Sequence, residues 1–142
     1  MRPNSSTLVA KEMGRRILYL DDDESLVLLV TRLLERRGHR VRGYTDSLEA
    51  LAAVRVNPGD FDLAITDYNM PGMSGLDVAI ALREIRSDLP VAIASGYVTQ
   101  AVHDQAPAAG VYEIFHKTDL IEDRCDAVAR WALAPRGGLA GT

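Results

Sequence analysis

The chain has 142 residues, 47% hydrophobic and 25% charged, a composition typical of one globular domain rather than a disordered or fibrous protein. The formal net charge of −4 argues against a nucleic-acid-binding domain, which usually carries a basic excess. A lone Cys125 excludes a disulfide framework and a cysteine-based zinc site, and the apolar runs are too short for a membrane span or a signal peptide. We therefore expect a cytoplasmic protein that binds neither membrane nor nucleic acid directly.

The first elements alternate between strand and helix. Residues 17–20 form an apolar run that predicts a buried strand. An apolar stripe of helical spacing through residues 26–34 predicts a helix, and Gly38 stands where its C-cap belongs. Residues 41–44 follow, and the polar residues around them predict a weaker, less buried strand.

The middle of the chain repeats the pattern. Asp46 and Glu49 have the spacing of a capping box, which predicts a helix start. Residues 61–66 predict the next buried strand. Ser74 and Asp77 have a similar, less ideal capping spacing before another apolar stripe, which predicts a third helix.

The last third predicts two more strands, at residues 91–94 and 111–115. The helix between them must lie within residues 99–109. It is expected to be short or bent, because Pro107 lacks a backbone N–H and clashes with the preceding turn. A final helix is predicted from Asp119 to about residue 133.

This alternation of strand and helix predicts a single α/β domain with a doubly wound, five-stranded parallel sheet and helices on both faces. The domain is expected to span residues 15–134. The segments 1–14 and 135–142 lack periodicity and are expected to be flexible.

Polar side chains follow four of the predicted strands. Asp21, Asp22 and Asp23 follow the first, and one of them is expected to cap the next helix; Asp67, Ser95 and Lys117 follow three later strands. Ligands of an open parallel sheet bind beyond the carboxyl ends of its strands, so these groups are expected to converge. Clustered carboxylates suit Mg²⁺, and a carboxylate can act as a nucleophile toward phosphorus. The set predicts phosphoryl chemistry, and no glycine-rich nucleotide loop follows the first strand.

The same segments resemble the receiver domain of two-component response regulators. The matching motifs are, in chain order, Ile17-Leu18-Tyr19-Leu20-Asp21-Asp22-Asp23-Glu24, then Asp67-Tyr68-Asn69-Met70-Pro71-Gly72-Met73-Ser74-Gly75, then Pro90-Val91-Ala92-Ile93-Ala94-Ser95-Gly96, and Lys117. The Asp-x-x-Met-Pro-x-Met-x-Gly stretch is the most specific of them. The resemblance covers roughly residues 15–133 and implies the flavodoxin-like strand order 2-1-3-4-5.

The resemblance implies a signalling switch that catalyses only its own phosphorylation and dephosphorylation, and is otherwise not an enzyme. It implies that Asp67 accepts a phosphoryl group from a histidine kinase or a phosphotransfer domain in a Mg²⁺-dependent reaction. The implied metal ligands are Asp22 directly, Asp21 through water, Asp67, and the backbone carbonyl of Asn69; Lys117 would pair with the phosphoryl group and Ser95 would donate to it.

Two positions depart from the family pattern. Thr118 stands where the family usually has proline, and Ile114 stands where it often has a switching aromatic ring. Residues 95–99 and 108–111 resemble receivers fused behind sensor histidine kinases, which implies that the chain could be part of a hybrid kinase. Output would then run through a partner, a homodimer, or further domains of a longer chain.

The residues leave two other interpretations open. Asp21-x-Asp23-x-Ser25 resembles the nucleophile motif of haloacid-dehalogenase-type phosphatases, which would make Asp21 the nucleophile. A receiver-like scaffold that binds a partner without being phosphorylated is the second. The position of the label left by acetyl phosphate distinguishes all three.

Overall fold

The computed structural model describes residues 14–96 and 99–116. The predictions for Lys117, Thr118, the final helix and the two terminal segments lie outside the described residues. The elements in chain order are β1 (Arg16–Leu20), α2 (Glu24–Arg36), β2 (Arg40–Tyr44), α3 (Ser47–Val56), the 3-10 helix η1 (Pro58–Asp60), β3 (Leu63–Asp67), α4 (Gly75–Ile85), β4 (Val91–Ser95), α5 (Gln100–Gln105) and β5 (Val111–His116).

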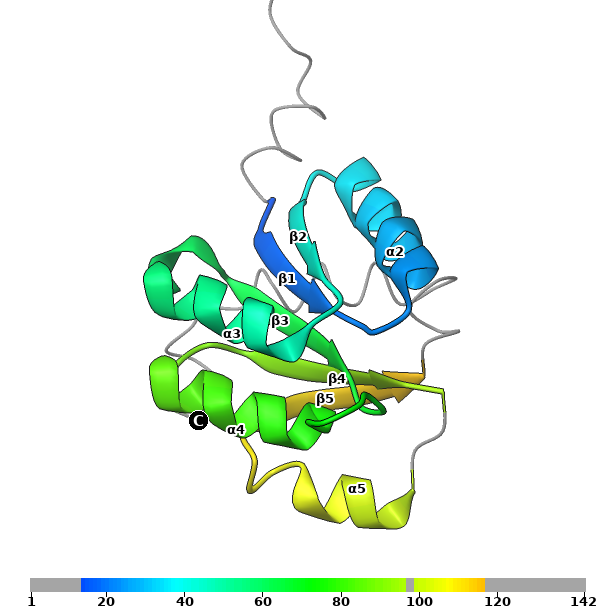
Figure 1. Cartoon of the computed structure of the whole chain (residues 1–142), viewed down its shortest axis with the longest axis vertical. Helices are drawn as coiled ribbons and strands as arrows, with labels where there is room; N and C mark the ends of the chain where they lie inside the picture. Colours follow the sequence, from blue (N-terminus) through cyan, green and yellow to red (C-terminus); the bar gives the residue numbers. More distant parts are fainter. Residues whose placement is uncertain (1–13, 97–98, 117–142) are drawn as a thin grey trace, which may run out of the picture.

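The five described strands form one parallel sheet in the order β2-β1-β3-β4-β5, which is the predicted order (Figure 1). Helix α2 packs on one face of this sheet, against a core that includes Tyr19 and Ile65. Helices α3 and α4 pack on the other face, against a core that includes Leu18, Phe61 and Ile93. The sheet is therefore covered on both faces, which explains why its central strands β3 and β4 are buried along their whole length.

The predicted cap residues begin α2, α3 and α4, although at α3 Asp46 acts as a simple N-cap that accepts from the N–H of Leu48 at 2.8 Å rather than as half of a capping box with Glu49. Asp23 is the aspartate that caps α2, because its side chain accepts a hydrogen bond from the N–H of Leu26 at 3.2 Å. Gly38 follows the end of α2 with a φ of 91°, a conformation that favours glycine. Ser74 and Asp77 form a complete capping box at α4.

Two predictions about irregular elements are confirmed. Strand β2 lies at the edge of the sheet and is only partly buried. Helix α5 is short, with six residues, and Pro107 lies in the turn that follows it rather than in the helix. Within the described residues, no helix is long and apolar enough to cross a membrane.

Strand β3 begins at Leu63 rather than at Phe61, which follows the 3-10 helix η1, and strands β3 and β4 both end one residue later than predicted. Asp67 and Ser95 are the last residues of their strands rather than the first residues after them. The ladder continues because Asp67 pairs with Ala94 in register, and the N–H of Tyr68 donates to the Ala94 carbonyl at 3.0 Å. Both polar side chains are therefore held by regular sheet geometry at the carboxyl edge.

Candidate functional site

Three carboxylates converge at the carboxyl edge of β1 and β3. Asp21, Asp22 and Asp67 each offer an oxygen atom, and these atoms lie within 4.8 Å of one another. Asp21 and Asp67 are buried, with 0% and 1% of their surface exposed, whereas Asp22 is exposed. The sequence prediction that acids from two strands meet here is confirmed.

Asp21 is held by hydrogen bonds to both of its carboxylate oxygens. The hydroxyl of Tyr19 donates to Oδ2 at 3.0 Å, and the backbone N–H of Asp23 donates to Oδ1 at 2.9 Å. Burial, with the Asp21 carboxylate beside it, raises the pKa of Tyr19 well above its ordinary value, so the hydroxyl keeps its proton. These two donors fix the orientation of a fully buried carboxylate.

Sequence reasoning missed the contact of Tyr19 with Asp21. Tyr19 stands inside an apolar run and was assigned only to the buried strand. Side chains two residues apart in a strand point to the same face, so the spacing of Tyr19 and Asp21 could have predicted this contact. A buried tyrosine also requires a partner for its hydroxyl, and the nearest polar group along that face is Asp21.

The other predicted site residues take different positions. Ser95 is buried at the end of β4, one residue beyond the register partner of Asp67. Asn69 is exposed in the loop after β3. The side chain of Thr66 donates to the backbone carbonyl of Asp67 at 3.1 Å, and this bond ties the end of β3 in place. Lys117 lies outside the described residues, so its place in the site stays a prediction.

Gly75 lets helix α4 begin directly against the backbone of Asp67. A Cβ atom at this position would lie 2.6 Å from the carbonyl oxygen of Asp67 and 2.9 Å from Cα of Tyr68. Neither neighbour is the end of a flexible side chain, so any larger residue would displace the loop or the helix. The N–H of Gly75 also donates to the Tyr68 carbonyl at 2.9 Å. This close approach gives a physical reason for the glycine that ends the Asp-x-x-Met-Pro-x-Met-x-Gly stretch.

The donor set fits a hard divalent cation. Mg²⁺ binds oxygen ligands at about 2.0–2.1 Å in octahedral geometry, which places neighbouring ligand oxygens about 3 Å apart and opposite ones about 4 Å apart. Three carboxylate oxygens within 4.8 Å of one another therefore need only small movements to share one ion. Without a cation, Asp21 and Asp67 would hold two like charges close together in a buried place.

Comparisons with known proteins agree on the kind of domain. A family model described as "Response regulator receiver domain" matches residues 17–128. The sensory/regulatory protein RpfC of Xanthomonas campestris pv. campestris is 31% identical over 131 residues, which cover 89% of this chain and 18% of RpfC. The response regulator receiver protein CpdR of Brucella abortus is 27% identical over 113 residues, which cover 77% of this chain and 92% of CpdR.

Solved structures give the same result. A response regulator receiver domain protein from Clostridium thermocellum is 29% identical, with a TM-score of 0.74, covering 89% of this chain and 98% of its own. The chemotaxis protein CheY4 of Vibrio cholerae is 25% identical, with a TM-score of 0.75, covering 82% of this chain and 98% of its own. The chain spans less than a fifth of RpfC but nearly all of these single receiver domains.

Proposed function

The chain belongs to the response regulator receiver family of two-component signalling, and on this basis we propose that Asp67 is its phosphoryl acceptor. The observation that carries the proposal is the convergence of Asp67 with Asp21 and Asp22 at the carboxyl edge of the sheet. The comparisons find no support for a haloacid-dehalogenase-type phosphatase or for a scaffold outside phosphoryl signalling.

In the proposed reaction, a carboxylate oxygen of Asp67 attacks phosphorus of a phosphohistidine on the donor. The new O–P bond forms as the N–P bond breaks, and the imidazole leaves and takes a proton from solvent. Mg²⁺, when bound, neutralises charge between the carboxylates and the phosphoryl oxygens. Both oxygens of Asp21 accept hydrogen bonds, which fits its proposed role as an oriented residue of the metal site.

The remaining roles follow the resemblance residue by residue. Asp22 would ligate Mg²⁺ directly and Asp21 through water, and Asn69 would add its backbone carbonyl. Ser95 would donate to the phosphoryl group from the end of β4, where it is already buried beside the acidic edge. Lys117 would pair with the phosphoryl charge. These groups serve one reaction on the chain itself, so the protein would act as a switch that catalyses only its own phosphorylation and dephosphorylation.

The proposed donor is a histidine kinase or a phosphotransfer domain. Because the chain spans 18% of RpfC, a protein named for sensory and regulatory work, we propose that it serves as the receiver module of a cytoplasmic signalling pathway. The kinase could belong to the same parent chain or to a separate protein, and a homodimer is one route for its output. Mixing the chain with a phosphorylated histidine donor and following phosphoryl transfer would test the partner directly.

Acetyl phosphate tests the acceptor without a kinase. The unmodified chain, incubated with acetyl phosphate and Mg²⁺, should gain the mass of one phosphoryl group, and EDTA should abolish that gain. Asp67→Asn should abolish it as well, and Asp22→Asn should slow labelling by weakening the metal site without moving the label. The expected label maps to the peptide that contains Asp67.

A matched aspartate variant shows whether a loss is specific. Asp46 caps α3 through its Oδ1, and asparagine caps helices equally well, so Asp46→Asn keeps the fold and removes one charge. This variant should be labelled at the normal rate. A label that maps to Asp21 and survives Asp67→Asn would refute the proposed acceptor and return the phosphatase interpretation.

A further inference from the structure

Basic residues gather at the end of the sheet opposite the acidic site. The chain is acidic overall, yet seven arginines stand in two short stretches: Arg15, Arg16, Arg32, Arg36, Arg37, Arg40 and Arg42. Helix α2 runs back from the carboxyl edge to the amino edge, so its last turn lies near the starts of β1 and β2 (Figure 1). The topology thus places most of these arginines at the amino edge of the sheet. Neither the phosphoryl site nor the core uses them.

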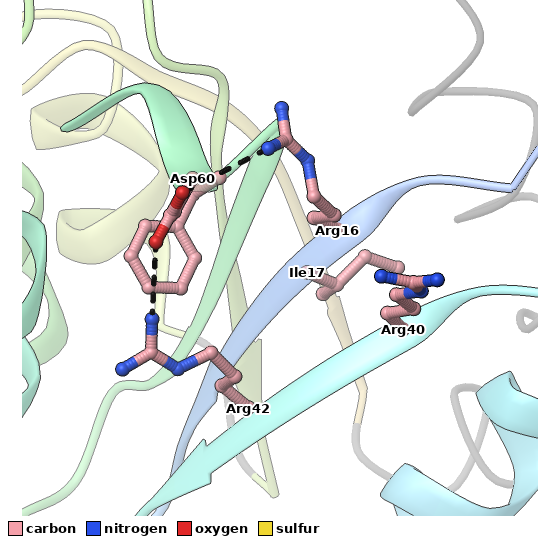
Figure 2. Close-up of a pocket in the computed structure, with 6 residues that line it drawn as sticks. Arg16, Ile17, Arg40, Arg42 and Asp60 are labelled. Atoms are coloured by element: carbon pink, nitrogen blue, oxygen red, sulfur yellow. Dashed lines mark ion pairs between the residues drawn. The ribbon is translucent and has the colours of Figure 1, made fainter. Parts of the chain in front are cut away.

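Three of these arginines line a cavity on the α3 face of the sheet. Arg16 and Arg40 are register partners, and Arg42 stands two residues beyond Arg40, so all three side chains lie on one face. The cavity has a volume of about 280 Å³, and Asp60 and Phe61 also line it. Figure 2 shows Asp60 facing Arg16 and Arg42. We name it the arginine pocket, defined by Arg16, Ile17, Arg40, Arg42, Asp60 and Phe61.

The arginines of this pocket are only partly neutralised. Arg16 and Arg42 share Asp60 at 3.9 and 3.7 Å, which is too long for a good hydrogen bond (Figure 2). Arg16 has a second partner, Asp62, at 3.4 Å. Among the described residues, the guanidinium groups of Arg40 and Arg42 make no hydrogen bond to the protein, and Arg40 has no ion pair. Two exposed guanidinium groups therefore keep their N–H donors for another molecule.

Aromatic rings hold one of the two groups in place. The guanidinium of Arg42 lies 5.0 Å from the centre of the Phe61 ring and 5.9 Å from that of Tyr44. Phe61 is fully buried, so this contact rests on the core. A guanidinium fixed on an aromatic ring loses less freedom when it binds an anion, which favours specific recognition over diffuse attraction.

We propose that the arginine pocket binds the phosphate group of a small molecule. A phosphate offers more acceptor oxygens than a carboxylate and therefore suits a cavity lined by several arginines, while a carboxylate would only repeat the contact that Asp60 makes. The cavity is concave and lies near the lower end of the volumes of small-molecule sites, so it suits a phosphate with a small body better than an extended macromolecule. Ile17 and Phe61 line the cavity beside the arginines.

Titration followed by heteronuclear NMR tests this site. The probes are inorganic phosphate, ribose 5-phosphate and AMP, added without Mg²⁺ at constant ionic strength. Saturable shift changes are expected at the amides of Ile17, Val41 and Phe61, and not at Asp21 or Asp67. Tighter binding of the two esters than of inorganic phosphate would identify a phosphate ester as the ligand; equal affinity would identify free phosphate. Both results support the site. If none of the probes bound at the arginine pocket, the proposal that Asp67 is the phosphoryl acceptor would still stand.

Substitutions separate a built site from general positive charge. Arg40→Ala and Arg42→Ala should each weaken binding at least about tenfold, as expected for loss of a charge-assisted hydrogen bond. Arg42→Lys keeps the charge but loses the planar fork, and it should also weaken binding. Arg32→Ala is the charge-matched control, because Arg32 is exposed on α2, outside the pocket. The proposal is overturned if the shift changes do not saturate, if Arg32→Ala weakens binding as much as the pocket variants do, or if Arg42→Lys binds as well as the unmodified chain. It is also overturned if polyglutamate, a model acidic peptide, binds and none of the three phosphate probes does.

Discussion

Removal of one hydroxyl group, in Tyr19→Phe, tests how the acidic site is built. Tyr19 and Asp21 are both fully buried, so no water replaces the hydrogen bond to Oδ2 once the hydroxyl is gone. A hydrogen bond to a charged group contributes about 1.5–3 kcal/mol to stability. The ring of Tyr19 packs in the core and phenylalanine preserves that packing. We therefore expect the free energy of unfolding without Mg²⁺ to fall by about 1.5–3 kcal/mol.

The same change should weaken Mg²⁺ binding. Asp21 keeps the hydrogen bond from the N–H of Asp23 but loses the donor that fixes its second oxygen. Groups that orient metal ligands typically change metal affinity by about 10- to 100-fold when they are removed. Because the hydrogen bond from the N–H of Asp23 remains, we expect the lower end, about a tenfold rise in the Mg²⁺ dissociation constant.

Urea unfolding in EDTA and calorimetric titration with Mg²⁺ measure the two effects. Tyr44→Phe is the matched control, since Tyr44 is half-buried and, within the described part of the chain, its hydroxyl makes no hydrogen bond to the protein. The control should keep both values near those of the unmodified chain. If Tyr19→Phe matched the control in stability and in Mg²⁺ affinity, the hydroxyl would have no orienting role.

Three further outcomes are expected. Asp67→Asn should raise the melting temperature in EDTA and abolish the stabilisation by Mg²⁺. The reason is that the buried carboxylates of Asp21 and Asp67, within 4.8 Å of each other, repel by about 3.5 kcal/mol at an effective dielectric constant of 20. Thermal unfolding with and without Mg²⁺ measures both effects. Lys117→Ala should weaken labelling by acetyl phosphate, or the spectral change that follows it, and leave the Mg²⁺ titration nearly unchanged. Burial, with Arg15 beside it, lowers the pKa of His39 below 6.5, so the folded state resists protonation. The contribution of His39 to stability should be full above about pH 6.5 and should fall as the pH drops below that value. His39→Asn keeps an acceptor for the backbone N–H of Arg15, so it should flatten this pH dependence. Urea unfolding at pH 5.5–7.5 measures the effect.

The sequence predicted what depends on periodicity and strand order. Apolar runs located the strands, and the rule that parallel strands present their carboxyl ends together brought Asp21 and Asp67 to one edge. It could not give exact strand ends, because the ladder bond from Tyr68 to Ala94 depends on the neighbouring strand. The need for glycine at position 75 likewise depends on how closely α4 approaches the Asp67 carbonyl, which is a tertiary distance.

Sequence reasoning missed the cluster of arginines at the amino edge of the sheet for a different reason. A net charge of −4 describes the whole chain and argued only against nucleic-acid binding, while Arg40 and Arg42 were interpreted as marks of a less buried strand. Net charge says little about local potential once the fold separates the signs. Here α2 has Glu24 in its first turn and Arg36 in its last, while β1 begins at Arg16 and is followed by three aspartates, so the two charges collect at opposite edges of one sheet.

The separation of these edges keeps the two sites electrostatically independent. Asp21 stands five residues after Arg16 along extended β1, about 16 Å at 3.3 Å per residue, and three residues, about 10 Å, after Leu18, the register partner of Arg42. The screening length at physiological ionic strength is about 8 Å, and the arginine side chains are exposed to that solvent. Charge bound at the arginine pocket therefore acts on Asp67 only weakly through space. Any coupling between the two sites must pass through the packing of β1, where Ile17 contributes to the arginine pocket and Tyr19 holds Asp21.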